Sequence, residues 1–563
     1  MDPRLERLHA LRGTFGPAGA RERGALLRAL ARTRWTRADA LAAWHDELLF
    51  VAAFPDAAAN LRLARSALAR IATRVRALPA RQRDALADSG IAGTVTSHTF
   101  MYGAARWLAA HDEDVAFAWE TPADAEAIDP LLRAQLTPVE QDRFDSTEVS
   151  TLDWLAEASG ARGPDDRGAG RAMARWLLRD PGAGDAALLR TLYDDAAPPL
   201  RWSIGDSPRS SSRGHLDVRP VLRRGFRALP RDPIALIATP LPGIRRARGA
   251  EAARWHDAAL AALLSRTREV FPTIYANHDE IHLAPLGEGV TLCLLGAARD
   301  DRSALEANYG YVMFSNGVPI GYGGVTPFGA QANTGANVFE SFRRSEAPFL
   351  FAQALRAFRT LFGVTRFVVN PYQFGAGNDE AIASGAYWFY DRLGFRPQSP
   401  RLATLAARER AAIAADRTHR SSVRTLRALA SDDLILTLPD ATGDGPLPES
   451  LLIDAGRLAT RALSGVTAGE RAGWLEREAR ALKSRCGGGT APLTRAERLG
   501  AMHLVPLLLA LAPHFARWSS SDRAALWALV ALKGAAQERD FARAAARLPA
   551  LWDALARAVR AAR

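Results

Sequence analysis

Strand-like runs are confined to the middle third of this chain, and this restriction does most to limit how it can fold. Between about residues 201 and 397 short apolar runs recur, whereas the sequence on either side follows the apolar spacing of helices. The runs are IALIATPL from Ile234, VTLCLLGA from Val290, YGYVMF from Tyr309, PIGYGGV from Pro319, NVFESF from Asn337 and RFVVN from Arg366. The sequence therefore predicts an α/β (α+β) domain with a mixed sheet, flanked by all-helical regions.

Two features predict how some of these strands pair. The linker between the third and fourth runs contains Asn316-Gly317, and because both residues tolerate positive φ, this dipeptide is typical of a hairpin between antiparallel neighbours. The later order is a strand at 337–342, a helix at 349–362 and a strand at 366–370. Such a crossover favours parallel pairing of the two strands.

The flanks predict a division into three regions. In the first region, Thr36 to Asp39 has the shape of a capping box before an apolar helical pattern, and a second helix is expected from Ala57 to Leu78. A Pro- and Gly-rich linker at 438–450 interrupts the helices after the α/β part. The expected regions are an N-terminal helical region (1–195), an α/β domain (196–400, core about 233–397) and a C-terminal basic helical region (401–563).

The charge balance gives only a weak indication of a partner. The 563 residues include 73 Lys and Arg against 61 Asp and Glu, a formal net charge of +12. Clustered cations favour phosphate-bearing partners, but Lys occurs only at Lys483 and Lys533, and an Arg- and Ala-rich composition is typical of a coding bias. Nucleic acid is therefore not favoured as a partner, although the excess charge is greatest after residue 400.

Cysteine usage and hydropathy predict a cytoplasmic protein. Cys293 and Cys486 lack any paired spacing, so neither a disulfide framework nor a zinc module is expected. The N-terminus lacks the apolar segment of a signal peptide. The most apolar run, from Leu504 to Pro513, is about ten residues long, well short of the ~20 that cross a bilayer. We therefore expect no contact with a membrane.

The stretch SGAYWFYDRLGFRP, Ser384 to Pro397, passes from a helical pattern into a Leu-Gly-Phe stop. With the antiparallel strands and the crossover before it, this stretch resembles the GNAT superfamily of N-acyltransferases over about 165 residues. In that family the last conserved helix carries an Ala and an aromatic pair ending in Tyr, and a Leu-Gly-Phe turn leads into a closing strand. The matching residues here are Ala386, Phe389, Tyr390 and Leu393-Gly394-Phe395.

The resemblance implies transfer of an acyl group from a coenzyme A thioester, usually acetyl-CoA, to an amine. The cofactor would lie where two parallel strands separate, its pantetheine arm bonded to amides of NVFESF and its pyrophosphate on the N-terminus of the following helix. Tyr390 would protonate the departing thiolate, and Glu340 would act as the base. The residues implied to bind the cofactor are Val338, Phe339, Arg343, Arg344, Ser345, Ala347 and Asn370.

The chain departs from the family pattern at the phosphate loop. Small residues let backbone amides approach phosphate oxygens closely, but the segment RRSEAPF, residues 343–349, places either Ala347 and Phe349 or Glu346 and Pro348 at the two glycine positions. The Glu346 carboxylate would repel a pyrophosphate, and Arg343 and Arg344 would compensate in part by ion pairing. A second departure, the insertion PYQFGAGNDEAIASG, precedes the last helix.

Alternatives to the enzyme remain open. An aromatic stripe in a helix is commonly core, so Tyr390 can serve packing alone, and Glu340 can simply pair with a cation. The chain is then a non-catalytic GNAT-like module whose helical flanks bind a protein partner, or a transferase that uses aminoacyl-tRNA. A cleft filled by Phe349 or Phe351 would favour a lost cofactor site. The acceptor amine, on a small molecule or a protein, is not identified.

His278 and His282 lie four residues apart, a spacing that on a helix can hold zinc. The zincin motif requires Glu directly after the first His, and Asp279 stands there instead. The neighbouring residues favour a strand or a loop. No metal site is therefore predicted.

Overall fold

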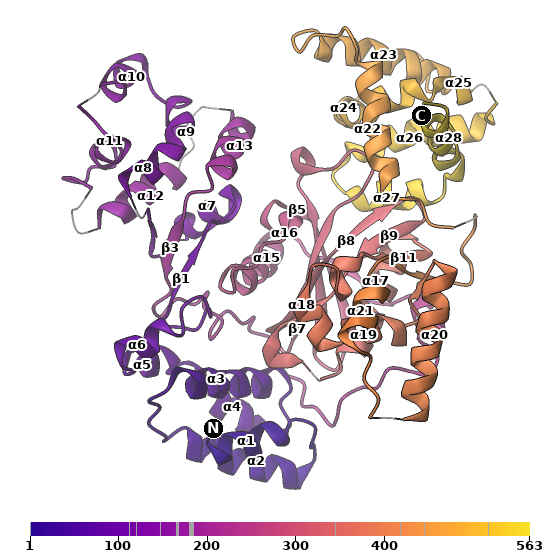
Figure 1. Ribbon diagram of the computed structural model, residues 1–563. Coiled ribbons are helices and arrows are strands. Elements are labelled where there is room, and N and C mark those ends of the chain that lie inside the picture. Colours follow the sequence, from indigo (N-terminus) through magenta and orange to yellow (C-terminus); the bar gives the residue numbers. More distant parts are fainter. Residues whose placement is uncertain are drawn as a thin grey trace. The chain divides into compact units, whose positions relative to one another are not determined.

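The computed structural model describes residues 2–111, 113–119, 121–146, 148–164, 168–179, 185–343, 345–416, 418–443, 445–515 and 517–562. The chain divides into two compact units (Figure 1). Unit 1 comprises residues 1–225, 254–275 and 314–320, and unit 2 comprises residues 226–253, 276–313 and 321–563. Most of the segments predicted as strands and the C-terminal helices therefore share unit 2, while the division into three regions stays a prediction.

The described part of unit 1 is mainly helical, with one small antiparallel sheet and the tip of the β7–β8 hairpin. The sheet has the order β1-β3-β2, with β1 at Val95–His98, β3 at Leu200–Ser203 and β2 at Val115–Phe117. The expectation of an all-helical N-terminal region (1–195) is thus wrong at β1 and β2. The helices are α1 (Pro3–Ala10), α2 (Pro17–Leu30), α3 (Ala38–Ala53), α4 (Ala58–Leu68), α5 (Ile71–Arg76), α6 (Ala80–Asp84), α7 (Tyr102–Ala110), α8 (Pro122–Ala125), α9 (Asp129–Arg133), α10 (Pro138–Phe144), α11 (Thr151–Ala158), α12 (Ala169–Arg179), α13 (Ala186–Ala196), most of α15 (Gly249–Leu264) and α16 (Phe271–Ile274).

Unit 2 contains a ten-stranded mixed sheet in the order β12-β13-β11-β9-β8-β7-β6-β5-β4, with β10 paired to β8. A mixed sheet with helical flanks was expected, and that fold class is confirmed. The strands are β4 (Arg245–Arg246), β5 (Ala276–Gly287), β6 (Val290–Ala297), β7 (Tyr309–Ser315), β8 (Val318–Phe328), β9 (Gln331–Thr334), β10 (Asn337–Val338), β11 (Arg366–Val369), β12 (Arg396–Pro397) and β13 (Leu434–Thr437).

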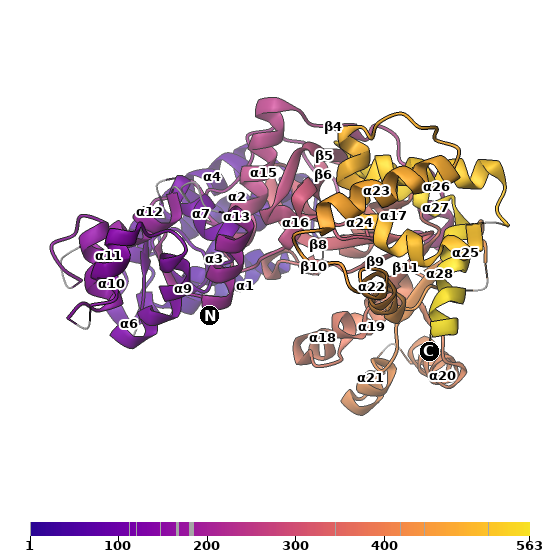
Figure 2. The same cartoon turned by 90° about the horizontal axis from the view of Figure 1, so that it is seen from above.

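The described helices of unit 2 gather in two groups. Figures 1 and 2 show α23 and α26 at one end of the unit, with α19 and α20 on the opposite side. The first group packs around a core that includes Trp552, whose ring meets Phe328 of β8 edge to face at 4.8 Å. Over both groups and the sheet faces, the described helices of unit 2 are α14 (Pro233–Ala238), α17 (Ala347–Phe362), α18 (Asp379–Ser384), α19 (Ala386–Arg392), α20 (Pro400–Ala415), α21 (Val423–Leu429), α22 (Ser450–Ala462), α23 (Arg471–Arg485), α24 (Arg495–Ala510), α25 (Ala512–Phe515), α26 (Ser520–Lys533), α27 (Glu538–Ala546) and α28 (Pro549–Ala562).

The predicted hairpin is confirmed, but the predicted parallel pairing of the strand at 337–342 with that at 366–370 is wrong: Asn337–Val338 pairs antiparallel with β8, and the preceding strand β9 is the parallel partner of β11. Asn316 and Gly317 have φ values of 49° and 81°, which form the tight turn between the neighbouring strands β7 and β8. β9 and β11 pair in parallel, with Phe367 opposite Ala332, and α17 makes the crossover between them. The hairpin tip at 314–320 is grouped with unit 1.

Three local expectations are wrong. IALIATPL forms α14 rather than a strand, because the Asp232 side chain accepts the amide of Ala235 and Pro233 fits a helix's first turn. NVFESF is a strand only at Asn337–Val338 and then becomes a 3₁₀ turn at Glu340–Phe342. The helix expected at 57–78 is broken into α4 and α5.

The sheet also extends beyond its expected end near residue 397. β13 lies between β11 and β12 and runs antiparallel to both. Its apolar run, Leu434-Ile435-Leu436, is short and lies in a helical context, which is why the sequence pattern did not indicate a strand. The predicted C-terminal helical region therefore contributes a strand to the sheet.

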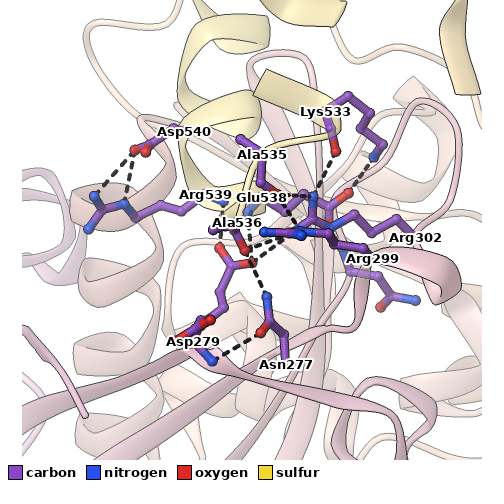
Figure 3. A network of polar contacts seen from close by, with 12 residues as sticks. Asn277, Asp279, Arg299, Arg302, Lys533, Ala535, Ala536, Glu538, Arg539 and Asp540 are labelled. Atoms are coloured by element: carbon purple, nitrogen blue, oxygen red, sulfur yellow. Dashed lines mark hydrogen bonds and ion pairs between the residues drawn. The ribbon is translucent and has the colours of Figure 1, made fainter. Parts of the chain in front are cut away.

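A buried polar network fastens α26 and α27 to the sheet (Figure 3). Arg302 donates to the backbone oxygens of Lys533, Ala535 and Ala536 at 2.7, 2.8 and 3.1 Å, at the C-terminal end of α26. The Glu280 carboxylate of β5 accepts the first two amides of α27, from Glu538 and Arg539, each at 2.7 Å. Each charge thus meets the helix end of opposite dipole sign.

The network balances its charges in the interior. The side chains of Glu280, Arg302, Lys533 and Glu538 are fully buried. Lys533 pairs with Glu538, and Tyr309 donates to Glu280 at 2.5 Å. Burial raises the pKa of Glu280 and lowers that of Lys533, because the low dielectric disfavours either charge. Loss of one member leaves its partner charged and buried.

We predict that Glu280→Gln lowers the free energy of unfolding by about 3 kcal/mol or more, because it leaves Arg302 buried without its carboxylate. Urea unfolding followed by circular dichroism measures this. Asp540→Asn is the control, since it breaks a partly exposed pair with Arg539 on α27 and is expected to cost less than about 1 kcal/mol. Equal losses in the two variants would contradict an anchoring role for Glu280.

Candidate functional site

The parallel strands β9 and β11 separate at one end of their pairing. They pair from Gln331 opposite Arg366 to Asn333 opposite Val368, and β11 then ends at Val369. The chain after β9 continues into β10, which pairs with β8. The register against β8 is the same before and after the break, with Thr334 opposite Val325 and Asn337 opposite Tyr322. Residues 335 and 336 therefore interrupt the pairing with β8, and the unchanged register shows that no extra residue is inserted.

Two tyrosines hold the peptide group at this break. The hydroxyl of Tyr311, on β7, donates to the carbonyl oxygen of Gly335 at 2.5 Å. The amide of Ala336 donates to the hydroxyl oxygen of Tyr390, on α19, at 3.3 Å. Both polar groups of the Gly335–Ala336 peptide are therefore bonded to side chains instead of a neighbouring strand.

Glycines make room for this arrangement. A Cβ at Gly323 would overlap both the Gly335 carbonyl and the Tyr311 hydroxyl. A Cβ at Gly335 would lie 2.6 Å from the side-chain oxygen of Gln373, which follows β11. Gln373 therefore packs against the separated strand, and the approach of the two tyrosines depends on small residues here.

Aromatic rings surround Tyr390. Phe351, Phe374 and Phe395 meet its ring edge to face at centroid distances of 5.9, 6.3 and 5.7 Å. Tyr390 is 2% exposed, and burial raises its pKa to about 12, against the lowering effect of the Ala336 hydrogen bond. The phenol is consequently protonated at neutral pH.

The helix that follows the break, α17, begins beside a buried ion pair. The N-cap residue is Glu346, whose carboxylate is fully buried. Arg227 grips that carboxylate through its backbone amide at 2.9 Å, its Nε at 3.1 Å and its Nη2 at 2.9 Å. The Arg227 guanidinium also lies 4.5 Å from the centre of the Phe349 ring. The carboxylate expected to repel a phosphate is thus neutralised within the fold.

The uncharged residues implied to bind the cofactor belong to several different elements. Val338 ends β10, and Phe339 packs on Tyr322 with ring centres 5.3 Å apart. Ser345 donates to the Phe342 carbonyl at 2.8 Å, and Ala347 begins α17. Asn370 accepts the amide of Tyr372 at 2.9 Å and so caps the 3₁₀ turn Pro371–Phe374.

Glu340 and Arg343 are at the surface. Arg343 pairs with Glu380 of α18 in an exposed ion pair. Arg344 lies outside the described residues. Glu340 is exposed and sits on the 3₁₀ turn Glu340–Phe342, not on a strand as expected. The Tyr390 hydroxyl therefore lies at the end of the β9–β11 pairing, whereas Glu340 is on an exposed turn.

Sequence reasoning missed Tyr311, Gln373 and Arg227. Tyr311 lies in a predicted strand, and only the alternation of its neighbours suggests which face it occupies. Arg227 contacts Glu346 from 119 residues away. No local pattern indicates either contact, because both arise from the packing of distant segments.

The histidine pair has no metal-site geometry. His278 and His282 are on β5, as the strand-or-loop expectation indicated. His282 is buried, and burial lowers its pKa to about 4. Within the described ranges, no group of three or more His, Cys, Asp or Glu is arranged to hold a metal ion. The described helices likewise include none long and apolar enough to cross a membrane.

Unit 1 contains a pocket of about 390 Å³ beside the end of α4. Its lining includes Arg65, Ser212 and His215. The Ser212 hydroxyl lies 3.0 Å from Nε2 of His45 and accepts the Ala92 amide at 3.1 Å. Because Ser212 and His45 are 1% and 2% exposed, this pair ties α3 to the 205–217 segment rather than presenting a nucleophile.

Comparison with protein-family models, with curated proteins and with solved structures finds no match for this chain.

We predict that Gly323→Ala lowers the free energy of unfolding by about 2 kcal/mol, because the added methyl group overlaps the Gly335 carbonyl and the Tyr311 hydroxyl. Thermal or urea unfolding measures the change. Gly456→Ala is the matched control: this exposed α22 position has no atom within 4 Å of the new Cβ, and we expect a gain of up to about 1 kcal/mol. If Gly323→Ala left the free energy of unfolding unchanged, the break would tolerate a side chain at residue 323.

Proposed function

We propose that this protein is an N-acyltransferase of the GNAT type, which moves an acyl group from a coenzyme A thioester such as acetyl-CoA to an amine. The observation that carries the proposal is the parallel pair β9–β11, which separates beside the hydroxyl of Tyr390. The α17 crossover and the strand β12, which directly follows Leu393-Gly394-Phe395, support it. These elements appear in the order that the resemblance implies.

Tyr390 is suited to stabilise the leaving thiolate by a hydrogen bond. Because its oxygen accepts the Ala336 amide, its own hydrogen points elsewhere and is available as a donor. A pKa of about 12 keeps it protonated at neutral pH. A thiol has a pKa near 8.5, so complete proton transfer from Tyr390 to the thiolate is uphill. We infer that Tyr390 keeps its proton and stabilises, by a hydrogen bond, the negative charge that develops on the leaving sulfur.

The other groups at the site have separate proposed roles. Val338 and the amides after it would contact the pantetheine arm, while the coenzyme would supply the activated thioester. The attacking amine must lose a proton, and the exposed Glu340 is the proposed base, directly or through a water molecule. Its exposure is compatible with an acceptor that arrives from solvent.

A second candidate is a non-catalytic GNAT-like module that binds a protein partner through its helical flanks. The burial of Phe351 and its contact with Tyr390 favour this candidate, because the aromatic cluster closes over the phenol. Gln373 packed against Gly335 adds to the closure. Entry of a thioester then requires these side chains to move.

Calorimetric titration with acetyl-CoA separates the two candidates. The enzyme requires saturable binding, whereas absence of binding at millimolar ligand would favour the non-catalytic module. Where binding is seen, thiol release in the presence of a panel of primary amines reports turnover.

We predict that Tyr390→Phe lowers thiol release by at least about tenfold with little change in acetyl-CoA affinity, because a donor to the developing thiolate is lost. The matched control is Tyr387→Phe on the same helix, since the buried Tyr387 hydroxyl has no hydrogen-bond partner among the described residues. Turnover that survives in Tyr390→Phe at the level of the control would remove Tyr390 from the mechanism.

A further inference from the structure

The helices α4 and α5 of unit 1 lie in a part of the chain that has many arginines and no acidic residue. Residues 57–83 include seven Arg and no Asp or Glu. Over the whole chain 73 Lys and Arg are set against 61 Asp and Glu, so the absence of acidic residues here departs from the average. The Arg-rich composition of the chain therefore does not account for the charge of this segment.

The arginines of α4 lie on its exposed face. The helix buries Leu61, Ala64 and Leu68. Arg62 and Arg65 are exposed and lie three residues apart, a spacing that places both side chains on one face of a helix. The face of α4 that is turned to solvent therefore presents two neighbouring guanidinium groups.

A second pair of arginines follows at the start of α5. Arg70 and Arg74 are four residues apart, and Arg74 donates to the backbone carbonyls of Ala31 and Thr33 rather than to a carboxylate. Burial lowers the pKa of Arg74, and the positive charge of Arg70 lowers it further. Like charges at these spacings destabilise a helix. An external anion would relieve this repulsion.

These arginines have few acidic partners. Among the described residues, Arg76 is the one of the seven that pairs with a carboxylate, that of Asp206 at 3.1 Å. The side chains of Arg62, Arg65 and Arg70 form no hydrogen bond or ion pair with another described residue. We call the following four residues the basic face: Arg62, Arg65, Arg70 and Arg74.

A further cation lies at the C-terminal end of α4. Arg213 donates to the Ala69 carbonyl at 2.7 Å and pairs with Asp206 at 3.2 Å. Arg65, Ala69 and Arg213 line the pocket of about 390 Å³, together with the exposed Asp217. The basic face therefore continues to the rim of this pocket, where one carboxylate meets two guanidinium groups.

The spacing of these cations fits an extended polyanion better than a small anion. A small anion is held where several donors converge, whereas the basic face follows α4, whose 11 residues extend about 16 Å, and continues onto α5. A nucleic-acid strand in a duplex has one phosphate for each ~3.4 Å of the axis, so several phosphates match this length. Residues 57–83 include no aromatic residue on which a base could stack.

We propose that the basic face binds the phosphate backbone of a nucleic acid, without preference for its base sequence. DNA and RNA share this backbone charge, so either can supply the ligand. The inference concerns unit 1 and requires no acyl donor. It therefore stands or fails independently of the acyl transfer proposed for unit 2.

Fluorescence polarisation of the full chain with labelled single strands of DNA and RNA, each about 20 nucleotides long, tests the inference. We expect both to bind at about 50 mM salt, with log K falling linearly as log salt rises, because binding releases counterions from the phosphates. Strands of two unrelated sequences are expected to bind within about threefold of each other. Tighter binding of one type of strand would identify it as the ligand.

Three results with the wild-type chain would overturn the inference. The first is absence of binding to either strand at about 50 mM salt. The second is AMP that binds as tightly as the strands, which would indicate a site for a small phosphate. The third is tighter binding to phosphatidylglycerol vesicles than to the strands at equal phosphate concentration, which would indicate a lipid surface.

A charge-removing variant tests the location. The triple variant Arg62→Gln, Arg65→Gln and Arg70→Gln is expected to bind at least about tenfold more weakly at about 50 mM salt. Its slope of log K against log salt is expected to be shallower by about 2, because each lost phosphate contact removes about 0.7. The substituted side chains are exposed and lack partners among the described residues, so we expect the variant to fold.

The matched control removes the same charge from unit 2. It combines Arg401→Gln, Arg424→Gln and Arg495→Gln, at exposed positions of α20, α21 and α24. We expect this control to keep the wild-type affinity within about threefold. Equal losses in the two triple variants would contradict a role for the basic face.

A charge-conserving variant tests the cause. Arg62→Lys, Arg65→Lys and Arg70→Lys together keep the positive charge, so we expect binding within about threefold of the wild type. Weakening as large as in the Gln variant would contradict an electrostatic origin. If the triple Gln variant does not fold, the single variant Arg65→Gln decides, because a salt slope equal to that of the wild type would exclude Arg65 from the contact.

Discussion

The peptide group between Gly335 and Ala336 is the constraint on which the proposed site depends. A peptide that leaves a sheet ladder must bond elsewhere, because an unpaired buried N–H or C=O costs about as much as a lost hydrogen bond. Tyr311 and Tyr390 supply those bonds from two different elements. The separation of β9 from β11 is therefore a stable part of the fold rather than a frayed end. The Tyr390 hydroxyl lies at the end of this pairing, on the Ala336 amide.

The buried charges at the opposite end of unit 2 perform a related task. Glu280 and Arg302 meet the start of α27 and the end of α26, where backbone groups again lack partners. Their burial would be costly for isolated ions, but Lys533 and Glu538 balance the charge. The C-terminal helices are consequently fastened to β5, and the sheet and these helices form one unit. In both regions, side chains bond backbone groups that have no partner in a helix or a sheet, and these bonds hold neighbouring elements together.

The sequence predicted part of the candidate site and missed the rest for a clear reason. The spacing of Tyr390 before Leu393-Gly394-Phe395 is local, and it placed the phenol on the last helix before a closing strand. The sequence also indicated that Glu346 interrupts a phosphate-binding pattern. It gave no sign that Arg227 neutralises this carboxylate, because the pairing joins residues 119 positions apart. Glu340 was expected on a strand, and the short turn that follows Val338 moved it to an exposed position.

The sequence by itself determined the hairpin at Asn316-Gly317, the crossover through α17 and the helical character of most of the flanks. These features follow from local preferences for φ and from apolar periodicity, which any segment carries with it. Only the tertiary structure decided that IALIATPL becomes α14 and that Leu434–Thr437 becomes β13, since short apolar runs suit either element until neighbours bury them. The tertiary structure also decided that Tyr311 and Tyr390 bond the Gly335–Ala336 peptide group. It likewise paired Arg227 with the Glu346 carboxylate. Hydrogen bonds and ion pairs between distant segments have no local sequence signal, because their partners meet only after folding.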